Sequence, residues 1–217
     1  MQLIKKKPIL LAISGGSGSG KSTLAKMLAQ KLGGAQTLIL SQDHYYKDLS
    51  KLSPEQREVW NFDHPDAIDA RRLQQDLEAL LDYRSIMRPS YDFATHTRLA
   101  EEVLVESRPY TILDGIFSLV FENIYRLAQV KVFVDVDDQT RLARRMKRDL
   151  EERGRSKESV ITQYEKTVRP MFVQYIEPSK KNADLVVPWG KDDFHSVQMI
   201  LNFLKQNRSV NDFGDPL

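Results

Sequence analysis

The chain of 217 residues contains no cysteine. This absence excludes disulfide bonds and metal sites built from thiolates, and it is compatible with a reducing compartment. The chain also lacks a long apolar run, and its basic opening, residues 1–7, leads into an expected strand and not into the apolar segment of a signal peptide. We therefore expect a cytoplasmic protein with no membrane partner.

A strong net charge of either sign is absent as well. The 32 basic and 30 acidic side chains leave a net charge of only +2. No overall field favours nucleic acid or a membrane surface, so we expect no nucleic-acid partner and consider each local charge cluster separately.

Hydrophobic residues make up 41% of the chain, which is enough for one sizeable core, and no change of composition indicates a linker. We predict a single domain over residues 1–217. Strand patterns alternate with helical patterns along most of the chain. The expected strands lie near residues 9–13, 37–41, 109–114, 130–136 and 184–188. This alternation predicts an α/β fold with a parallel sheet and helices on both of its faces.

Three further segments lie outside this alternation or at its end. Residues 86–106, with alternating Val103 and Val105, predict a small β-hairpin insertion over the sheet edge. Residues 192–205 predict a last helix that packs through one apolar face, and residues 207–217 are expected to form a flexible tail. The apolar face of that helix contains Phe194, Val197, Leu201 and Leu204.

A glycine-rich segment follows the first expected strand and precedes a helix that starts near Lys21. It has the spacing G-x-x-x-x-G-K-S from Gly15 to Ser22, which is typical of a phosphate-binding P-loop. Glycines bring successive backbone N–H groups close to phosphate oxygens, and the helix N-terminus adds partial positive charge. Lys21 would reach the β- and γ-phosphates, and the Ser22 hydroxyl would bind Mg²⁺. The expected nucleotide-binding residues are Gly15, Gly16, Ser17, Gly18, Ser19, Gly20, Lys21, Ser22 and Thr23.

Acidic residues end two other expected strands. Asp43 follows the second strand, and Asp114 ends the strand near residues 109–114 after an apolar run. Because the carboxyl ends of parallel strands face the same crevice, Asp43 is placed to accept a proton from a hydroxyl group or to orient Mg²⁺. Asp114 has the pattern of a Walker B carboxylate, which holds Mg²⁺ directly or through water. The alternative for Asp43 is a solvated turn aspartate.

Residues 141–170 carry a basic helical face. Arg141, Arg144, Arg145 and Arg148 are spaced three and four residues apart, and Arg153 and Arg155 follow around Gly154. With a triphosphate site elsewhere in the chain, this pattern favours an arginine-rich helical lid that closes on the transferring phosphoryl group. A solvated helix face and a nucleic-acid surface are the alternatives.

Two functions of another class are alternatives to phosphoryl transfer. A GTP-dependent switch would need an N-K-x-D motif, and residues 181–184 contain the same letters only in scrambled order. A nucleic-acid binder driven by nucleotide hydrolysis would rest on residues 141–148 alone.

Five segments together resemble the uridine kinase (uridine-cytidine kinase) family, in order and in spacing. The most specific are Asn-Phe-Asp-His-Pro-Asp at residues 61–66 and Tyr-Asp-Phe-Ala-Thr-His-Thr-Arg at residues 91–98. The others are residues 15–22, the Ser-Gln-Asp of residues 41–43, and residues 148–155. The resemblance covers about residues 8–205.

The resemblance implies a role for each matching residue. Asp43 would be the base that faces the nucleoside 5′-hydroxyl, with Lys21, Arg148 and Arg153 near the phosphates. Asp63 would hold the ribose hydroxyls with help from Arg145. The base would be read by Tyr91 and His96 and packed by Phe93, with further nucleoside contacts from Arg155 and Gln163. The implied metal-binding set is Ser22, Asp43 and Asp114.

The resemblance also implies the reaction and its setting: ATP-dependent phosphorylation of uridine and cytidine at the 5′-hydroxyl in pyrimidine salvage, with Mg²⁺. It further implies a homotetramer, often restrained by cytidine triphosphate. A related kinase acting on pantothenate or a sugar phosphate is the nearest alternative.

Individual residues keep simpler alternatives, and one position departs from the family. Asp63 could cap a helix that begins near Asp66, and Tyr91 and Phe93 could be ordinary hairpin packing. Where the family usually has Glu-Gly, this chain has Asp114 followed by glycine.

Overall fold

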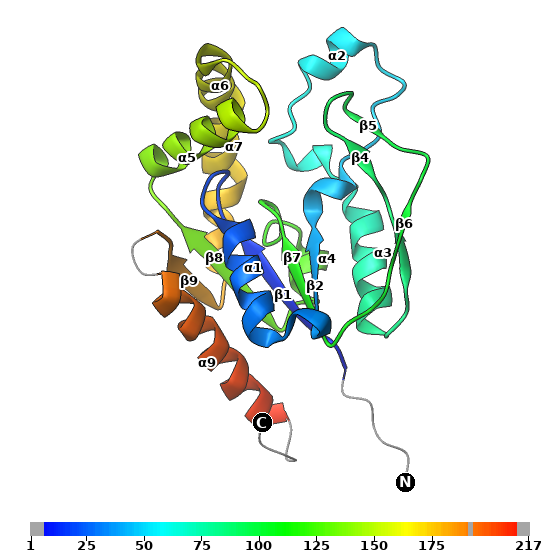
Figure 1. The fold of residues 1–217 in the computed structure, drawn as a ribbon, viewed down its shortest axis with the longest axis vertical. Helices are drawn as coiled ribbons and strands as arrows, with labels where there is room; N and C mark the ends of the chain where they lie inside the picture. Colours follow the sequence, from blue (N-terminus) through cyan, green and yellow to red (C-terminus); the bar gives the residue numbers. More distant parts are fainter. Residues whose placement is uncertain (1–6, 191–192, 212–217) are drawn as a thin grey trace.

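The computed structural model describes residues 7–190 and 193–211. A sheet of five strands in the order β2-β7-β1-β8-β9 forms its centre, and every neighbouring pair is parallel. The strands are β1 (Ile9–Ser14), β2 (Thr37–Ser41), β7 (Tyr110–Asp114), β8 (Val130–Asp135) and β9 (Leu185–Pro188). Each expected strand lies within one residue of its place. The predicted parallel α/β fold is confirmed, and Figure 1 shows the sheet with helices packed around it.

Alternate residues of β1 point to two separate cores, which is why this strand is apolar throughout. Leu11 and Ile13 pack with residues of α1 (Lys21–Leu32) and α9 (Asp193–Asn211), and these helices lie side by side on one face (Figure 1). Leu10 and Ala12 pack on the opposite face with α3 (Ala70–Leu81), α4 (Glu122–Tyr125) and the helical segment around Phe172. Burial on both faces fixes the register of the central strand, because a shift of one residue would exchange the two sets.

The last helix differs from its prediction at both ends. Val197, Ile200 and Leu204 are buried, as expected of a packing face, but Phe194 is 62% exposed. The helix runs to Asn211 and therefore includes the beginning of the segment that was predicted to be a tail. Residue 192 and residues 212–217 of the predicted helix and tail lie outside the described residues.

The lid region contains two helices separated by a turn. These are α5 (Asp138–Glu151), capped by the Asp137 carboxylate, and α6 (Lys157–Gln163), capped by the Ser156 hydroxyl. Gly154 in the turn has φ 61°, a left-handed conformation that suits glycine.

Beyond α6 the chain stays helical to residue 182, but two segments widen into π-helix, at Tyr164–Val168 and Phe172–Ile176. Short α-helical turns, α7 (Arg169–Met171) and α8 (Glu177–Ser179), follow them and carry Pro170 and Pro178. A proline has no N–H for the carbonyl four residues back and clashes with it. We attribute each wide turn to the proline that follows.

The predicted hairpin insertion is confirmed, in the form of two short antiparallel pairs. β3 (Ile86–Arg88) pairs with β6 (Val103–Val105), and β4 (Tyr91–Asp92) pairs with β5 (Thr97–Arg98). The insertion stands beside α3, and α2 (Pro54–Glu58) lies close to its tip (Figure 1). Hydrogen bonds from Arg57 to the carbonyls of Ser50, Leu52 and Thr95 join the α2 segment to the β4–β5 turn. In the described part of the chain, no helix has both the length and the apolar character needed to cross a membrane.

Candidate active site

The glycine-rich segment forms a tight loop between β1 and α1, as its spacing predicts. Gly18 and Gly20 have φ values of 81° and 97°, in the region that favours glycine. A Cβ atom on Gly18 would lie 2.3 Å from the carbonyl oxygen of Arg141, and one on Gly20 would lie 2.3 Å from the Trp189 ring. Backbone conformation and close packing therefore both require glycine here.

Lys21 is folded back over this loop. Its side chain is buried, and Nζ donates a hydrogen bond to the carbonyl oxygen of Gly16 at 3.0 Å. Burial lowers the pKa of Lys21, and the nearby carboxylates of Asp114 and Asp43 act in the opposite direction. The ammonium group is thus held where a bound phosphate chain would meet it, with few water molecules to compete.

The predicted metal-binding oxygens lie together at the end of the sheet. The Ser22 hydroxyl donates a hydrogen bond of 2.5 Å to the Asp114 carboxylate, so the short side chain reaches the first turn of α1. Burial and the neighbouring Asp114 charge raise the pKa of Asp43. Among the described residues, no group of three or more His, Asp or Glu could hold a metal alone. A hydroxyl and two neighbouring carboxylates do fit a cation such as Mg²⁺, which binds few protein oxygens together with phosphates.

A cavity of about 360 Å³ lies over the P-loop. Six of the nine expected nucleotide-binding residues line it, together with Asp43 and Asp114. The six are Ser17, Gly18, Gly20, Lys21, Ser22 and Thr23. Gly15, Gly16 and Ser19 belong to the same loop but do not line the cavity, and the Ser19 side chain is fully buried.

A second cavity of about 720 Å³ opens beside the first. All seven residues expected to bind the nucleoside line it. They are Asp63, Tyr91, Phe93, His96, Arg145, Arg155 and Gln163. Both cavities share Ser17, Asp43, Ile116 and Arg148. Asp43 therefore lies at the junction of the phosphate-loop cavity and the larger one.

Aromatic rings form one wall of the larger cavity. His96 stacks on Phe62 with ring centroids 4.5 Å apart, and Tyr91 meets Phe93 edge to face at 5.3 Å. The Tyr91 hydroxyl is buried and has no hydrogen-bond partner within the described part of the chain. Trp60 lines the cavity mouth and is 39% exposed. Phe62 and Trp60 were not singled out from the sequence as site residues, although Phe62 belongs to the motif of residues 61–66.

Asp63 also lines this cavity and does not cap a helix, so the capping alternative is wrong. Its carboxylate accepts a hydrogen bond from the Thr167 hydroxyl at 3.1 Å, while the His64 ring caps the next turn. Burial raises the pKa of Asp63, and the charge of Arg145 opposes that shift.

The buried stripe of α5 is charged, which the apolar pattern of the helix did not indicate. Arg141, Arg145 and Asp149 are at most 6% exposed, whereas Leu150 on another face is 40% exposed. The Arg141 guanidinium lies 3.6 Å from the centre of the Phe172 ring. The solvated-face alternative is therefore wrong for Arg141 and Arg145.

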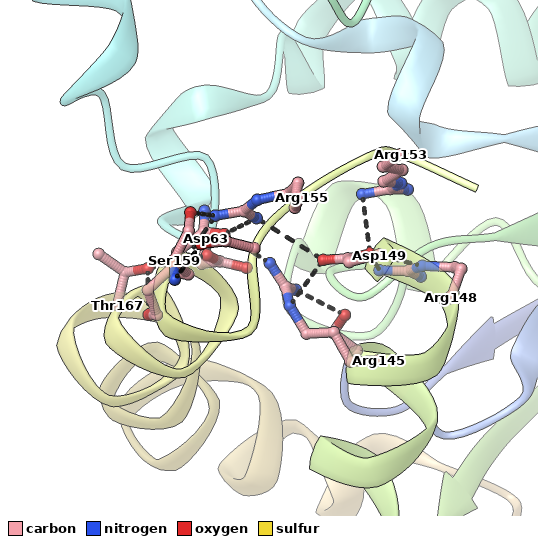
Figure 2. A network of polar contacts seen from close by, with 11 residues as sticks. Asp63, Arg145, Arg148, Asp149, Arg153, Arg155, Ser159 and Thr167 are labelled. Carbon is pink, nitrogen blue, oxygen red and sulfur yellow. Dashed lines mark hydrogen bonds and ion pairs between the residues drawn. The ribbon is translucent and has the colours of Figure 1, made fainter. Parts of the chain in front are cut away.

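Several arginines of the lid, Arg145 among them, extend toward the two cavities. Arg145 donates hydrogen bonds to the Ser17 hydroxyl at 2.8 Å and to the Gln163 amide oxygen at 2.9 Å. Arg155 donates to the same Gln163 oxygen at 2.5 Å. The Asp149 carboxylate lies among them and pairs with Arg148 (Figure 2). Asp149 was not identified as a site residue from the sequence, where an acid among arginines is typical of exposed helical ion pairs.

Comparison with known proteins identifies the family of this chain. The model of the "Phosphoribulokinase / Uridine kinase family" matches residues 10–195. A uridine kinase of Lactobacillus johnsonii is 46% identical over 196 residues, which cover 90% of this chain and 93% of that protein. A uridine kinase of Ligilactobacillus salivarius is 43% identical over 197 residues, which cover 91% and 92%.

Solved structures with the same fold are more distant in sequence. Phosphoribulokinase from Rhodobacter spheroides has a TM-score of 0.64 at 15% identity, over 84% of this chain and 70% of that one. D-glycerate 3-kinase from Cryptococcus neoformans has a TM-score of 0.61 at 15% identity, over 80% of each chain. At this level of identity the likeness concerns the fold alone. The family model and the relatives, which extend over nearly all of a chain that carries the P-loop and both cavities, show that this protein belongs to the phosphoribulokinase and uridine kinase family.

Proposed function

We propose that the protein transfers the γ-phosphoryl group of ATP to the 5′-hydroxyl of uridine and cytidine. The position of Asp43 at the junction of the two cavities carries this proposal. One cavity has the P-loop of a triphosphate site, and the other offers aromatic rings and a carboxylate of the kind that bind a nucleoside. The names of the relatives support uridine as the acceptor.

In the proposed reaction, the 5′-oxygen of the nucleoside forms a bond to the γ-phosphorus, and Asp43 accepts the proton that this oxygen loses. The bond from that phosphorus to the bridging oxygen breaks, and ADP leaves with the electron pair. Lys21, Arg148 and Arg153 would stabilise the negative charge on the phosphoryl oxygens. Ser22 and Asp114, with Asp43 close by, would hold Mg²⁺, which supplies charge neutralisation on the phosphates when bound.

The nucleoside would be held by both sides of the larger cavity. Asp63 and Arg145 are suited to the ribose hydroxyls, because a carboxylate accepts and a guanidinium donates. Tyr91 and His96 can each serve as donor or acceptor and so meet either a C4 carbonyl or a C4 amino group. Phe93 supplies apolar area for the ring, and Arg155 with Gln163 would add polar contacts.

The assembly implied by the resemblance and the location expected from the composition stay predictions. We propose a cytoplasmic protein, as its composition indicates, that forms a homotetramer inhibited by cytidine triphosphate, as the resemblance implies. Sedimentation velocity of the purified protein would measure the oligomer, and inhibition by that nucleotide at fixed ATP would measure the restraint.

The function is tested by ADP release across a panel of acceptors. The panel contains uridine, cytidine, adenosine, guanosine, pantothenate and a set of sugar phosphates, each with ATP and Mg²⁺. We expect turnover with both pyrimidine nucleosides and little with purines. A sugar phosphate or pantothenate that exceeds both pyrimidines in kcat/KM would replace the proposed acceptor by the related-kinase alternative.

A further inference from the structure

Asp149 is fully buried at the centre of an arginine cluster (Figure 2). One of its oxygens, Oδ1, accepts a hydrogen bond from Arg148 Nε at 2.9 Å and forms an ion pair with Arg148 Nη2 at 2.8 Å. Arg153 lies 3.6 Å from the same oxygen. Arg145 Nε and Arg155 Nη1 lie 3.5 Å and 3.6 Å from the other oxygen, Oδ2. One carboxylate therefore faces four guanidinium groups.

Such a cluster needs a counter-charge because four cations in a partly buried site repel one another. Asp149 supplies it from the helix that also carries Arg145 and Arg148, so the carboxylate and these two guanidiniums share one rigid backbone. The Arg155 amide also donates to the Asp149 carbonyl oxygen at 3.1 Å, which ties the turn after α5 back to the same residue. The last turn of α5 and the turn that follows it are thus joined at Asp149.

All four arginines around Asp149 line the larger cavity. Arg148 lines both cavities, and Arg153 lines the larger one. Arg145 bridges from the cluster to the P-loop through Ser17. Asp149 itself lines neither cavity, so any effect it has on the reaction passes through these side chains.

We propose that Asp149 is a positioning residue, whose buried charge aims the lid arginines at the transferring phosphoryl group. This proposal rests on the proposed kinase function. It assigns Asp149 no contact with either substrate. Its two oxygens have different roles. Oδ1 holds Arg148 by a hydrogen bond and an ion pair. Oδ2 keeps Arg145 and Arg155 near each other by charge, since it has no hydrogen-bond partner within the described residues.

The proposal predicts a separation of binding from turnover. Removal of the negative charge makes the site more positive, so ATP affinity should stay the same or rise. The guanidiniums lose their common anchor, however, and should no longer meet the transition state in one geometry. An aspartate that only supported the fold would instead weaken ATP binding and turnover together.

Asp149→Asn tests this because it keeps the shape of the side chain and removes its charge. We expect kcat for uridine to fall by about ten- to a hundredfold, the loss associated with a misplacement of about 1 Å. We expect the Kd of ATP, measured by calorimetry without uridine, to be unchanged or lower. Glu151→Gln is the matched control, since it makes the same charge change at an exposed site on the same helix and should leave both values unchanged.

Asp149→Glu provides a second measurement, which also serves if the asparagine variant does not fold. It keeps the charge but moves it by one methylene, and its kcat should lie between those of wild type and Asp149→Asn. Wild-type kcat in either variant would overturn the proposal, as would a loss of ATP affinity that parallels the loss of kcat. If the wild-type protein phosphorylates no nucleoside in the panel, the proposed function is wrong. If the wild-type protein is active and the variants are equally active, only the role of Asp149 is wrong.

Discussion

Asp43 combines a position between two cavities with a neighbouring carboxylate, and its charge is the property that the proposed reaction needs. Asp43→Asn keeps its size and removes its ability to accept a proton. We expect kcat to fall by about 10²- to 10⁴-fold, the usual contribution of a general base. ATP binding, measured by calorimetry, should be retained because the P-loop is unchanged. A raised Kd for ATP, with kcat preserved at saturating ATP, would make Asp43 a nucleotide-binding residue instead.

Asp63 is the residue expected to distinguish ribose from deoxyribose. A buried carboxylate that accepts from a hydroxyl loses a partner when that hydroxyl is absent, at a cost of about 1–3 kcal/mol. Asp63→Ala should therefore lower kcat/KM for uridine by roughly ten- to a hundredfold and change the value for 2′-deoxyuridine far less.

Asp66→Ala is the control for this experiment, because Asp66 lies three residues away with its side chain 85% exposed. Both kcat/KM values should stay as in wild type in this variant. Equal proportional losses for uridine and deoxyuridine in Asp63→Ala would show that the carboxylate supports the lid through Thr167 and does not read the ribose.

At the scale of elements, the P-loop packs tightly against Trp189, which directly follows β9. Gly20→Ala places a methyl group against Trp189 and also forces a residue with a side chain into a left-handed conformation. The two costs together should lower the free energy of unfolding by about 2–4 kcal/mol, which denaturant titration would measure.

Gly34→Ala is the matched control, because a Cβ atom there meets nothing within 4 Å and its φ is not in the left-handed region. Its stability should change by less than about 0.5 kcal/mol. A Gly20 variant as stable as this control would mean that Trp189 can move aside at little cost.

Elements defined by local pattern could be predicted from the sequence. The strands and α1 follow from apolar periodicity, and the P-loop follows from eight consecutive residues whose spacing alone determines the backbone. The π-helical turns before Pro170 and Pro178 could not be predicted, since an isolated proline pattern indicates a helix end as readily as a widened turn.

The candidate site was predictable where a motif was specific, and less so where burial decides. Asp63 and the hairpin aromatics belong to short motifs, so they could be placed in advance. Asp149 could not, because the helical pattern indicates which residues share a face but not that the charged face is the buried one. Trp60 reaches the larger cavity through the course of the α2 segment, which no periodicity describes.

At the scale of the whole molecule, the two cavities lie side by side and share four lining residues. One ligand that reaches into both cavities should therefore bind more tightly than a ligand of one cavity. Adenosine and uridine joined by a chain of four phosphates should occupy both cavities at once. Its Kd should lie roughly tenfold or more below that of ATP, since the second half binds at an effective concentration near the millimolar range. Competition against ATP in calorimetry would measure it.

The matched ligand for this test is the same compound with adenosine in place of uridine. It should bind no more tightly than ATP if the larger cavity favours pyrimidines. Equal affinity of both conjugates and ATP would mean that the cavities cannot be filled together.

The aromatic wall of the larger cavity contributes no strand to the five-stranded sheet. β4 and β5 form a sheet of their own, and the segment with Trp60 and Phe62 runs outside the central strands. The aromatic contacts to the acceptor are therefore carried by segments outside the sheet that positions the P-loop, and the lid supplies the polar contacts. In the evolution of such a scaffold, changes at the aromatic positions of residues 60–62 and 91–96 would alter the acceptor range while the strands and the P-loop stay as they are.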